Sequence, residues 1–221
     1  MYLSQLILNP RNRRVQRELA NPYEMHRSIM RAFPDGLVKG KERVLFRVDE
    51  HPRLGAPALL VQSLVRPDWL WLAEGPGTSG YLLADVQDNP GVKPFALTLK
   101  AVQVLAFRLR ANPTRRLSAG QGNKGKRVGI YGEEEQMRWL SRKGEQHGFR
   151  VLQVRLGGQA RIKKHKAIHR QGQAHDLELL SVQFDGLLQV TDPPRLVRAV
   201  ESGIGSGKGF GFGLLSLASA R

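Results

Sequence analysis

The order in which apolar strands and amphipathic helices follow one another constrains the fold of this chain most. Near the N-terminus the pattern predicts a strand over Tyr2 to Leu8, a helix over Pro22 to Phe33, and two strands over Arg43 to Val48 and Ala58 to Val65. A strand, a helix and two strands form the first half of a ferredoxin-like α+β sandwich. No convincing second helix follows them, and residues 73–94, rich in Gly and Pro, are expected to be irregular.

The second half of the chain repeats this order. The expected elements are a strand over the second part of Leu97 to Arg110, a helix from Glu133 to about Gln146, strands over Phe149 to Leu156, Leu177 to Phe184 and Leu187 to Thr191, a helix from Asp192 to Glu201, and a strand over Leu214 to Ala218. Arg108 and Arg110 share the face opposite the apolar side chains of their strand. Asp185-Gly186 is typical of a two-residue hairpin turn. We therefore predict two tandem ferredoxin-like domains, over residues 1–90 and 95–221.

Segments between these elements are basic and polar. Arg11 to Arg17 allows a short helical turn that ends at Ala20, Asn112 to Gly125 is expected to be a loop, and Gln159 to Gln173 is expected to form an exposed loop or hairpin. At the start of the first helix Asn21 suits the N-cap, and Glu24 can reach back to it as in a capping box.

The net charge of the chain indicates which classes of partner it binds. Its 35 Lys and Arg residues against 19 Asp and Glu residues give a formal net charge of +16. An excess of this size favours a polyanionic partner, either nucleic acid or an acidic membrane. Membrane association is the weaker of the two, because the basic stretches lack interleaved bulky apolar residues. No apolar run approaches the ~18 residues of a membrane span, so we expect a cytoplasmic protein.

The residue types present also limit the chemistry. Cys is absent, which excludes disulfides, a thiolate nucleophile and Cys-ligated metals. His165 and His169 are four residues apart, but they lie in a polycationic stretch that would repel a divalent ion. We therefore expect no metal and no other cofactor.

The helix that starts at Pro22 carries the strongest chemical signal. Its apolar side is formed by Met25, Ile29, Ala32 and Phe33. At ~100° per residue, Tyr23, Arg27 and Arg31 fall on the other side, with His26 at the border beside Tyr23. A lone histidine on a helix is more often a surface residue or a hydrogen-bonding residue at the edge of a core. Here imidazole, phenol and guanidinium groups together supply what attack of a ribose 2′-hydroxyl on the adjacent phosphate requires.

Gly occupies every odd position from Gly203 to Gly213. This spacing excludes the dinucleotide-binding fingerprint, which needs two glycines three residues apart, and the residues around Lys208 do not match a P-loop. Backbone amides beside Lys208 can face phosphate oxygens. A flexible connection between a helix and a strand is the alternative, and the net charge favours phosphate contact.

Basic side chains along the whole chain are candidates for nucleic-acid contact, although charge runs are commonly just solvated. The candidate RNA-binding residues are Arg27, Arg31, Arg108, Arg110, Arg115, Arg116, Arg161, Lys163, Lys164, Lys166, Gly205, Gly207, Lys208 and Gly209.

Five segments in order along the chain resemble those of a known family. They are Leu6 to Pro10, Leu19 to Arg27, Val61 to Ser63 with Pro67 to Trp69, Phe107 to Pro113, and the Gly run continued by Leu214 and Leu215. With these segments the chain resembles the CRISPR RNA-processing endoribonucleases of the RAMP superfamily, in the CasE (Cse3) subgroup of type I-E systems.

The resemblance implies two tandem ferredoxin-like domains and metal-free cleavage of the CRISPR repeat transcript at the 3′ base of its hairpin. The products would carry a 2′,3′-cyclic phosphate and a 5′-hydroxyl. The resemblance makes His26 the catalytic acid or base and Tyr23 its helper, and it implies that the protein keeps its guide RNA within the multi-subunit Cascade surveillance complex. Some relatives have Lys where this chain has Arg31, and a guanidinium does not give up its proton, so Arg31 is expected to act only electrostatically. The alternative is a non-catalytic RNA-binding scaffold, for which the pair of Tyr23 and His26 is not needed.

Overall fold

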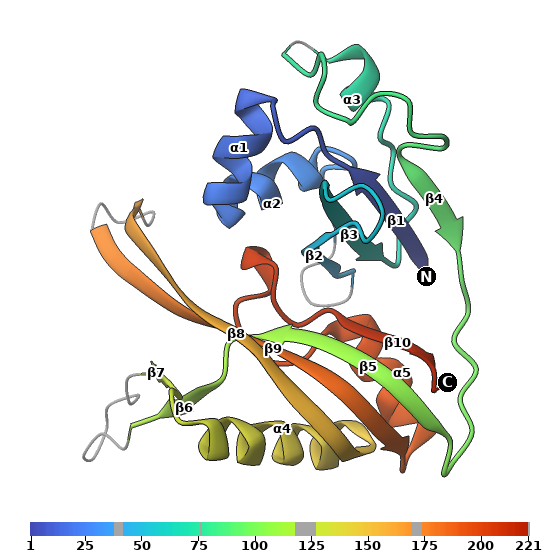
Figure 1. The fold of residues 1–221 in the computed structure, drawn as a ribbon, viewed down its shortest axis with the longest axis vertical. Helices are drawn as coiled ribbons and strands as arrows, with labels where there is room; N and C mark the ends of the chain where they lie inside the picture. The colour runs from blue at the N-terminus through green and yellow to red at the C-terminus, as the bar shows by residue number, and fades with distance from the viewer. Residues whose placement is uncertain (38–41, 76, 118–126, 169–173, 221) are drawn as a thin grey trace. The chain divides into compact units, whose positions relative to one another are not determined.

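The computed structural model describes residues 1–37, 42–75, 77–117, 127–168 and 174–220, without the side chains of residues 73–74 and 162–177. The chain divides into two compact units (Figure 1). The first unit comprises Met1–Thr98, Glu201–Gly203 and Lys208–Leu214, and the second comprises Leu99–Val200, Ile204–Gly207 and Leu215–Arg221. The odd-numbered Gly run is thus shared between the units. The domain limits of 1–90 and 95–221 stay a prediction.

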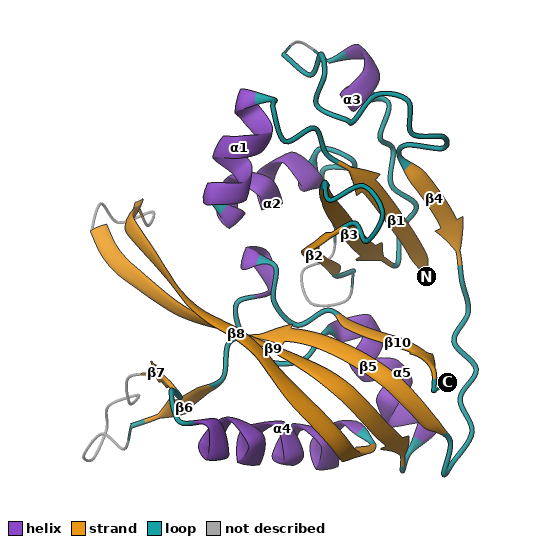
Figure 2. Ribbon diagram, in the orientation of Figure 1, coloured by secondary structure: helices purple, strands orange, loops and turns teal. Residues whose placement is uncertain are grey.

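The first unit is an antiparallel sheet with helices packed on it (Figure 2). Its elements are β1 (Tyr2–Ile7), α1 (Arg13–Ala20), α2 (Pro22–Met30), β2 (Val44–Glu50), β3 (Pro57–Ser63), α3 (Trp71–Glu74), β4 (Gly91–Pro94) and the 3-10 helix η1 (Lys208–Phe210). The strand order β2-β3-β1-β4 is that of a ferredoxin-like sheet. Its second crossover contains only the four residues of α3, which explains why the sequence shows no clear helix there.

The second unit repeats the same topology. Its elements are β5 (Val104–Ala111), β6 (Thr114–Arg116), β7 (Arg127–Gly129), α4 (Glu133–His147), β8 (Phe149–Ile168), β9 (Ala174–Val190), α5 (Pro193–Ser202) and β10 (Leu215–Ser219). The strand order is β10-β5-β9-β8, and β6 and β7 form a separate two-stranded sheet. The predicted α+β class with two ferredoxin-like sheets is therefore confirmed.

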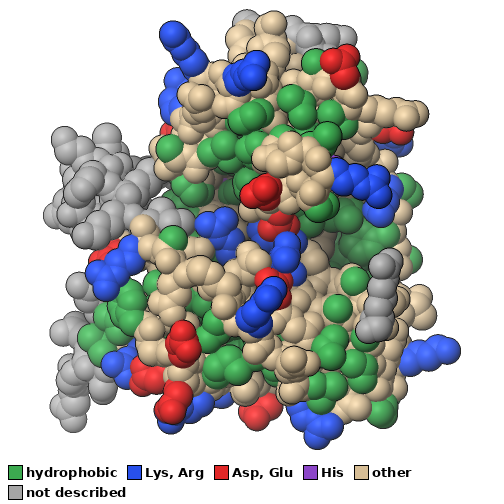
Figure 3. Space-filling view, in the orientation of Figure 1, with side chains coloured by type: hydrophobic (Ala, Val, Ile, Leu, Met, Phe, Trp, Pro, Cys, Tyr) green, Lys and Arg blue, Asp and Glu red, His purple; other side chains and the backbone are tan. Residues whose placement is uncertain are grey.

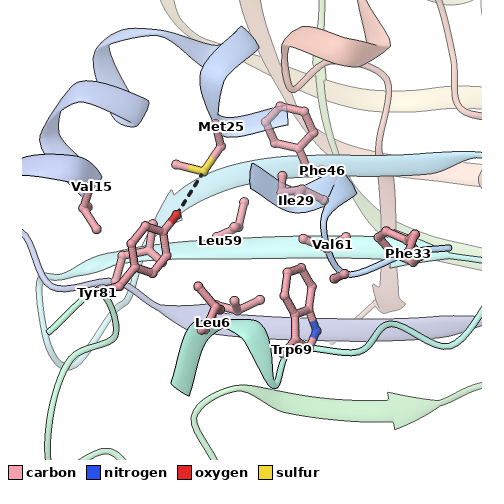
Figure 4. Close-up of a cluster of buried hydrophobic side chains, with 13 residues drawn as sticks. Leu6, Val15, Met25, Ile29, Phe33, Phe46, Leu59, Val61, Trp69 and Tyr81 are labelled. Atoms are coloured by element: carbon pink, nitrogen blue, oxygen red, sulfur yellow. Dashed lines mark hydrogen bonds between the residues drawn. The ribbon is translucent and has the colours of Figure 1, made fainter. Parts of the chain in front are cut away.

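The core of the first unit explains where α2 lies. Leu6 from β1 and Leu59 and Val61 from the neighbouring strand β3 pack with Met25 and Ile29 from α2 in one buried cluster (Figure 4). These are the positions that the 3.6-residue period assigned to the apolar side of the helix. The period therefore fixes which face of α2 is buried and leaves His26 at its edge, half-buried.

The Asp185-Gly186 turn was predicted wrongly, because both residues lie inside the continuous strand β9. Arg108 Nε on the neighbouring strand β5 donates a hydrogen bond to Asp185 Oδ1 at 2.6 Å. A Cβ at Gly186 would collide with the carbonyl oxygen of Gln153, next to a register shift in the β8–β9 pairing. Gly186 thus lets the backbone of β8 come close to β9. Glycine serves this role inside strands as well as its role in hairpin turns, which the sequence had suggested here.

The segment Gln159 to Gln173 is predicted as an exposed loop or hairpin; its residues up to Ile168 form part of a strand paired with β9, and residues 169–173 lie outside the described part of the structure. β8 continues to Ile168 and pairs with β9 as far as Ala174, so both strands extend well beyond their apolar parts. Ladder hydrogen bonds do not need apolar side chains, which is why the pattern stopped at Leu156.

Three local predictions need correction. The basic stretch from Arg11, expected to be a short helical turn, forms the eight-residue helix α1 with the side chain of Asn12 as its N-cap, and this helix ends at Ala20 as predicted. Asn21 precedes α2 but makes no side-chain capping bond, since its backbone already closes α1 through the carbonyls of Arg17 and Glu18. Segments 73–94 and 112–125, expected to be irregular, contain the short strands β4 and β6.

No helix in the described part of the chain has the length and apolar character needed to cross a membrane.

Candidate active site

Helix α2 is held to α1 by a buried carboxylate. Glu18 of α1 is 2% exposed and accepts three hydrogen bonds: from Arg14 Nε at 2.8 Å, from Ser28 Oγ at 2.6 Å and from Tyr81 Oη at 2.6 Å. Ser28 is on α2 and Tyr81 follows α3, so one side chain ties three segments together. Burial, and then the charge and hydrogen bond of Glu18, raise the pKa of Tyr81. The phenol therefore stays protonated and keeps donating.

The second half of the Gly run, from Lys208 onward, packs beside His26 and Tyr23 of α2. Lys208–Leu214 belong to the first unit, and Gly209 lies against the imidazole of His26, since a Cβ there would be 3.5 Å from His26 Cδ2. The ring of Phe210 lies 6.1 Å from that of Tyr23. The chain is fixed farther along by Arg47 Nη1, which donates to the carbonyl of Leu214 at 3.3 Å.

Gly211 explains part of the glycine spacing. Its φ of +82° is a conformation that L side chains rarely adopt, and a Cβ there would lie 3.2 Å from Phe46 Cε2. Gly209 does not have such a φ, and a Cβ there would make only an ordinary van der Waals contact with His26, so neither observation requires a glycine at this position.

A cavity of about 480 Å³ opens beside His26. Lys208, Arg43, Glu42 and Asp35 line it together with His26 and apolar residues. The cavity brings a titratable imidazole and two cationic side chains to one concave surface, which is the combination that a phosphodiester requires.

The imidazole of His26 sits in a low-polarity position. Burial lowers its pKa below the ordinary value of 6.5, because desolvation disfavours the charged form. Nδ1 is buried and has no hydrogen-bond partner among the described residues. The free protein therefore presents a neutral imidazole near pH 7 that lines the cavity, and such a ring can act as proton donor or acceptor through Nε2.

The structure brings Tyr23 and His26 to the same edge of α2, but it places the predicted arginines differently. Arg31 lies after the last residue of α2, and its guanidinium stacks 4.3 Å from the centroid of Trp71. Arg31 comes five positions after His26, which corresponds to a rotation of about 140° around the helix axis between the two side chains. Arg27 forms an exposed ion pair with Glu24 at 3.2 Å.

Among the candidate RNA-binding residues of the second unit, Arg108, Arg115 and Arg161 are exposed and Arg110 is half-buried. Arg108 pairs with Asp185, Arg110 Nε donates to Ser181 Oγ at 2.8 Å, and Arg115 is 3.5 Å from Glu135. Arg161 lies over the ring of Tyr131 at 4.7 Å. Exposed pairs of this kind contribute little to stability, so phosphates can replace the acidic partners.

Lys and Arg side chains are spread over the surface drawn in Figure 3, with Asp and Glu among them. Arg116 is exposed in β6, and Gly205 in the second unit packs against Trp139. Gly207 has a φ of +79°. The side chains of Lys163, Lys164 and Lys166 lie outside the described part of the structure. The assignment of all these residues to RNA contact remains a prediction.

Sequence reasoning missed four residues that shape the site. They are Glu18, Phe46, Trp71 and Phe210. Phe210 could have been noticed as an aromatic residue within the Gly run, but a buried Glu and a strand Phe carry no local signal of their partners. Within the described ranges, no group of three or more His, Asp or Glu side chains is placed to hold a metal ion.

Comparisons with known proteins agree with this picture. A family model described as "CRISPR associated protein" matches residues 1–219. The chain is 40% identical to the CRISPR-associated endoribonuclease Cse3 of Thermus thermophilus, covering 99% of this chain and 100% of the relative. It is 30% identical to the CRISPR system Cascade subunit CasE of Escherichia coli, covering 99% of both chains. A solved structure of a CRISPR endoribonuclease Cse3 bound to a 19-nucleotide RNA superposes with a TM-score of 0.82 at 39% identity, covering 99% of this chain and 100% of that one.

Proposed function

The chain belongs to the CRISPR-associated protein family, in its CasE/Cse3 branch of endoribonucleases, and from this premise we propose that it matures CRISPR guide RNA. It binds the hairpin of the repeat transcript and cuts the strand at the hairpin's 3′ base. The observation that carries the proposal is His26 at the edge of a cavity that Lys208 also lines, in a chain similar to an endoribonuclease over its whole length.

The proposed reaction needs no metal. The 2′-oxygen of the nucleotide before the cut attacks the adjacent phosphorus, a P–O2′ bond forms, and the P–O5′ bond breaks. One proton leaves the 2′-hydroxyl and one is delivered to the departing 5′-oxygen. His26 performs one of these transfers, Tyr23 assists it, and Lys208 and Arg43 offset the charge that develops on the phosphate.

The protein is further proposed to keep its product and to serve as a subunit of the Cascade complex, as its Escherichia coli relative does by name. The proposed site of action is the cytoplasm, where the transcript is made. A non-catalytic RNA holder is the less favoured function, because the Thermus relative is an endoribonuclease at 40% identity.

Incubating the protein with a repeat hairpin in EDTA tests the proposal. We expect one cut, products with a 2′,3′-cyclic phosphate and a 5′-hydroxyl, and no cut in a matched RNA that has a single 2′-deoxy nucleotide before the scissile phosphate. Stable binding of the all-ribose hairpin without cutting, or cutting of the 2′-deoxy RNA, would contradict it.

A further inference from the structure

The catalytic histidine is oriented without a hydrogen bond to its inner nitrogen. In acid–base histidines the second ring nitrogen usually bonds to a carboxylate or a backbone carbonyl, which fixes the ring and its tautomer. Here Nδ1 of His26 is buried, and the described residues offer it no acceptor or donor. Packing must therefore supply the orientation that hydrogen bonding does not.

The side chain that packs on this ring is Phe46. Its ring centroid lies 6.1 Å from that of His26, and the two ring planes differ by only 12°. Offset parallel arrangements of this kind are favourable for aromatic rings, and they restrict rotation of both. The contact joins β2 to α2, so it sets the angle of the imidazole relative to the sheet.

Phe46 itself has little freedom to move. It is 1% exposed and belongs to the same buried cluster as Met25 and Ile29, which precede and follow His26 on α2 (Figure 4). On another side Gly211 approaches so closely that a Cβ would come within 3.2 Å of the Phe46 ring. A rigid aromatic plane therefore lies against the imidazole.

We propose that Phe46 is a positioning residue for the reaction, which acts by holding the His26 imidazole at the angle needed to reach the scissile linkage. The inference rests on the proposed function, because the orientation matters only if His26 transfers a proton. Misplacement of a reacting group by about 1 Å can cost 10²-fold in rate, so loss of the aromatic plane is expected to affect chemistry far more than binding.

Two substitutions with matched controls test this role. Phe46→Leu removes the ring, and Phe46→Met removes it while keeping more of the volume. Phe33→Leu and Phe33→Met are the controls, because Phe33 belongs to the same cluster and is 7% exposed, but its ring packs edge-on against Trp69. The Met pair decides the question if the Leu variants do not fold.

We expect the Phe46 variants to lower the single-turnover cleavage rate of a repeat hairpin by about 10- to 100-fold, with hairpin affinity changed less than about twofold. The pKa of His26, followed by NMR, should rise toward its ordinary value because water reaches the loosened ring. The charged groups that line the cavity beside it, Asp35, Glu42, Arg43 and Lys208, are the same in every variant. The Phe33 variants should keep both the rate and the pKa.

Wild-type cleavage rates in both Phe46 variants would overturn the inference, and so would an equal loss of rate in the Phe33 variants. Either result leaves the proposed function standing as long as the wild-type protein cuts the hairpin. A wild-type protein that does not cut it would instead refute the proposed function itself.

Discussion

Replacing His26 with alanine is expected to lower the rate of hairpin cleavage by about 10² to 10⁴-fold, the usual contribution of a general acid or base. The affinity for the hairpin should stay nearly unchanged. His26 is half-buried at the edge of α2, and because burial lowers its pKa the imidazole is mostly neutral near pH 7 and contributes little charge to phosphate binding beside the Lys and Arg side chains. The loss is therefore expected in the chemical step, measured as a single-turnover rate with the hairpin bound.

A second histidine of the same unit provides the control. His51 lies in the loop between β2 and β3, where its Nδ1 accepts a hydrogen bond from the backbone of Leu54 at 3.3 Å. His51→Ala should cut at the wild-type rate. Cleavage at the wild-type rate by His26→Ala would show that the imidazole has no part in the reaction.

Glu18→Ala is expected to produce the largest loss of stability. Arg14, Ser28 and Tyr81 would all lose their shared acceptor, and a buried donor left unsatisfied costs about 1–3 kcal/mol of folding free energy. The donors belong to three segments of the first unit. Because these segments hold α2, the helix of His26 should loosen as well, and cleavage should fail at a lower temperature than in the wild-type protein.

Chemical denaturation measures this effect, and Glu24→Ala is the matched control. Glu24 is an acidic residue of α2 whose partner, Arg27, is exposed, so the pair is worth less than about 0.5 kcal/mol. A free energy of unfolding for Glu18→Ala equal to that of Glu24→Ala would mean that the buried network does not stabilise this unit.

The sequence predicted the parts of the site that depend on local periodicity. Met25 and Ile29 are buried because their spacing matches the helical repeat, and the same geometry places His26 at the border of the buried face. The order strand, helix, strand, strand along the chain was enough to predict a ferredoxin-like sheet, because short connections between elements allow few strand orders.

What the sequence could not supply depends on contacts between distant segments. Phe46 and Gly209 meet His26 only after β2 and the C-terminal segment have reached α2. Arg31 follows the helical period in the sequence, but α2 ends at Met30 and the guanidinium stacks on Trp71 instead. Gly186 shows the same limit, since a turn and a close strand approach select the same residue type.

The proposed reaction requires the His26 imidazole to face the RNA backbone, and an NMR titration of this ring measures whether it does. The protein is labelled at histidine, the His26 signal is assigned by its loss in His26→Gln, and the pH titration is repeated with a bound hairpin that carries the 2′-deoxy nucleotide. Nearby phosphate charge favours the imidazolium, so we expect a shifted His26 signal and a higher pKa of His26 in the complex than in the free protein. An unchanged signal and pKa in a fully bound complex would contradict it.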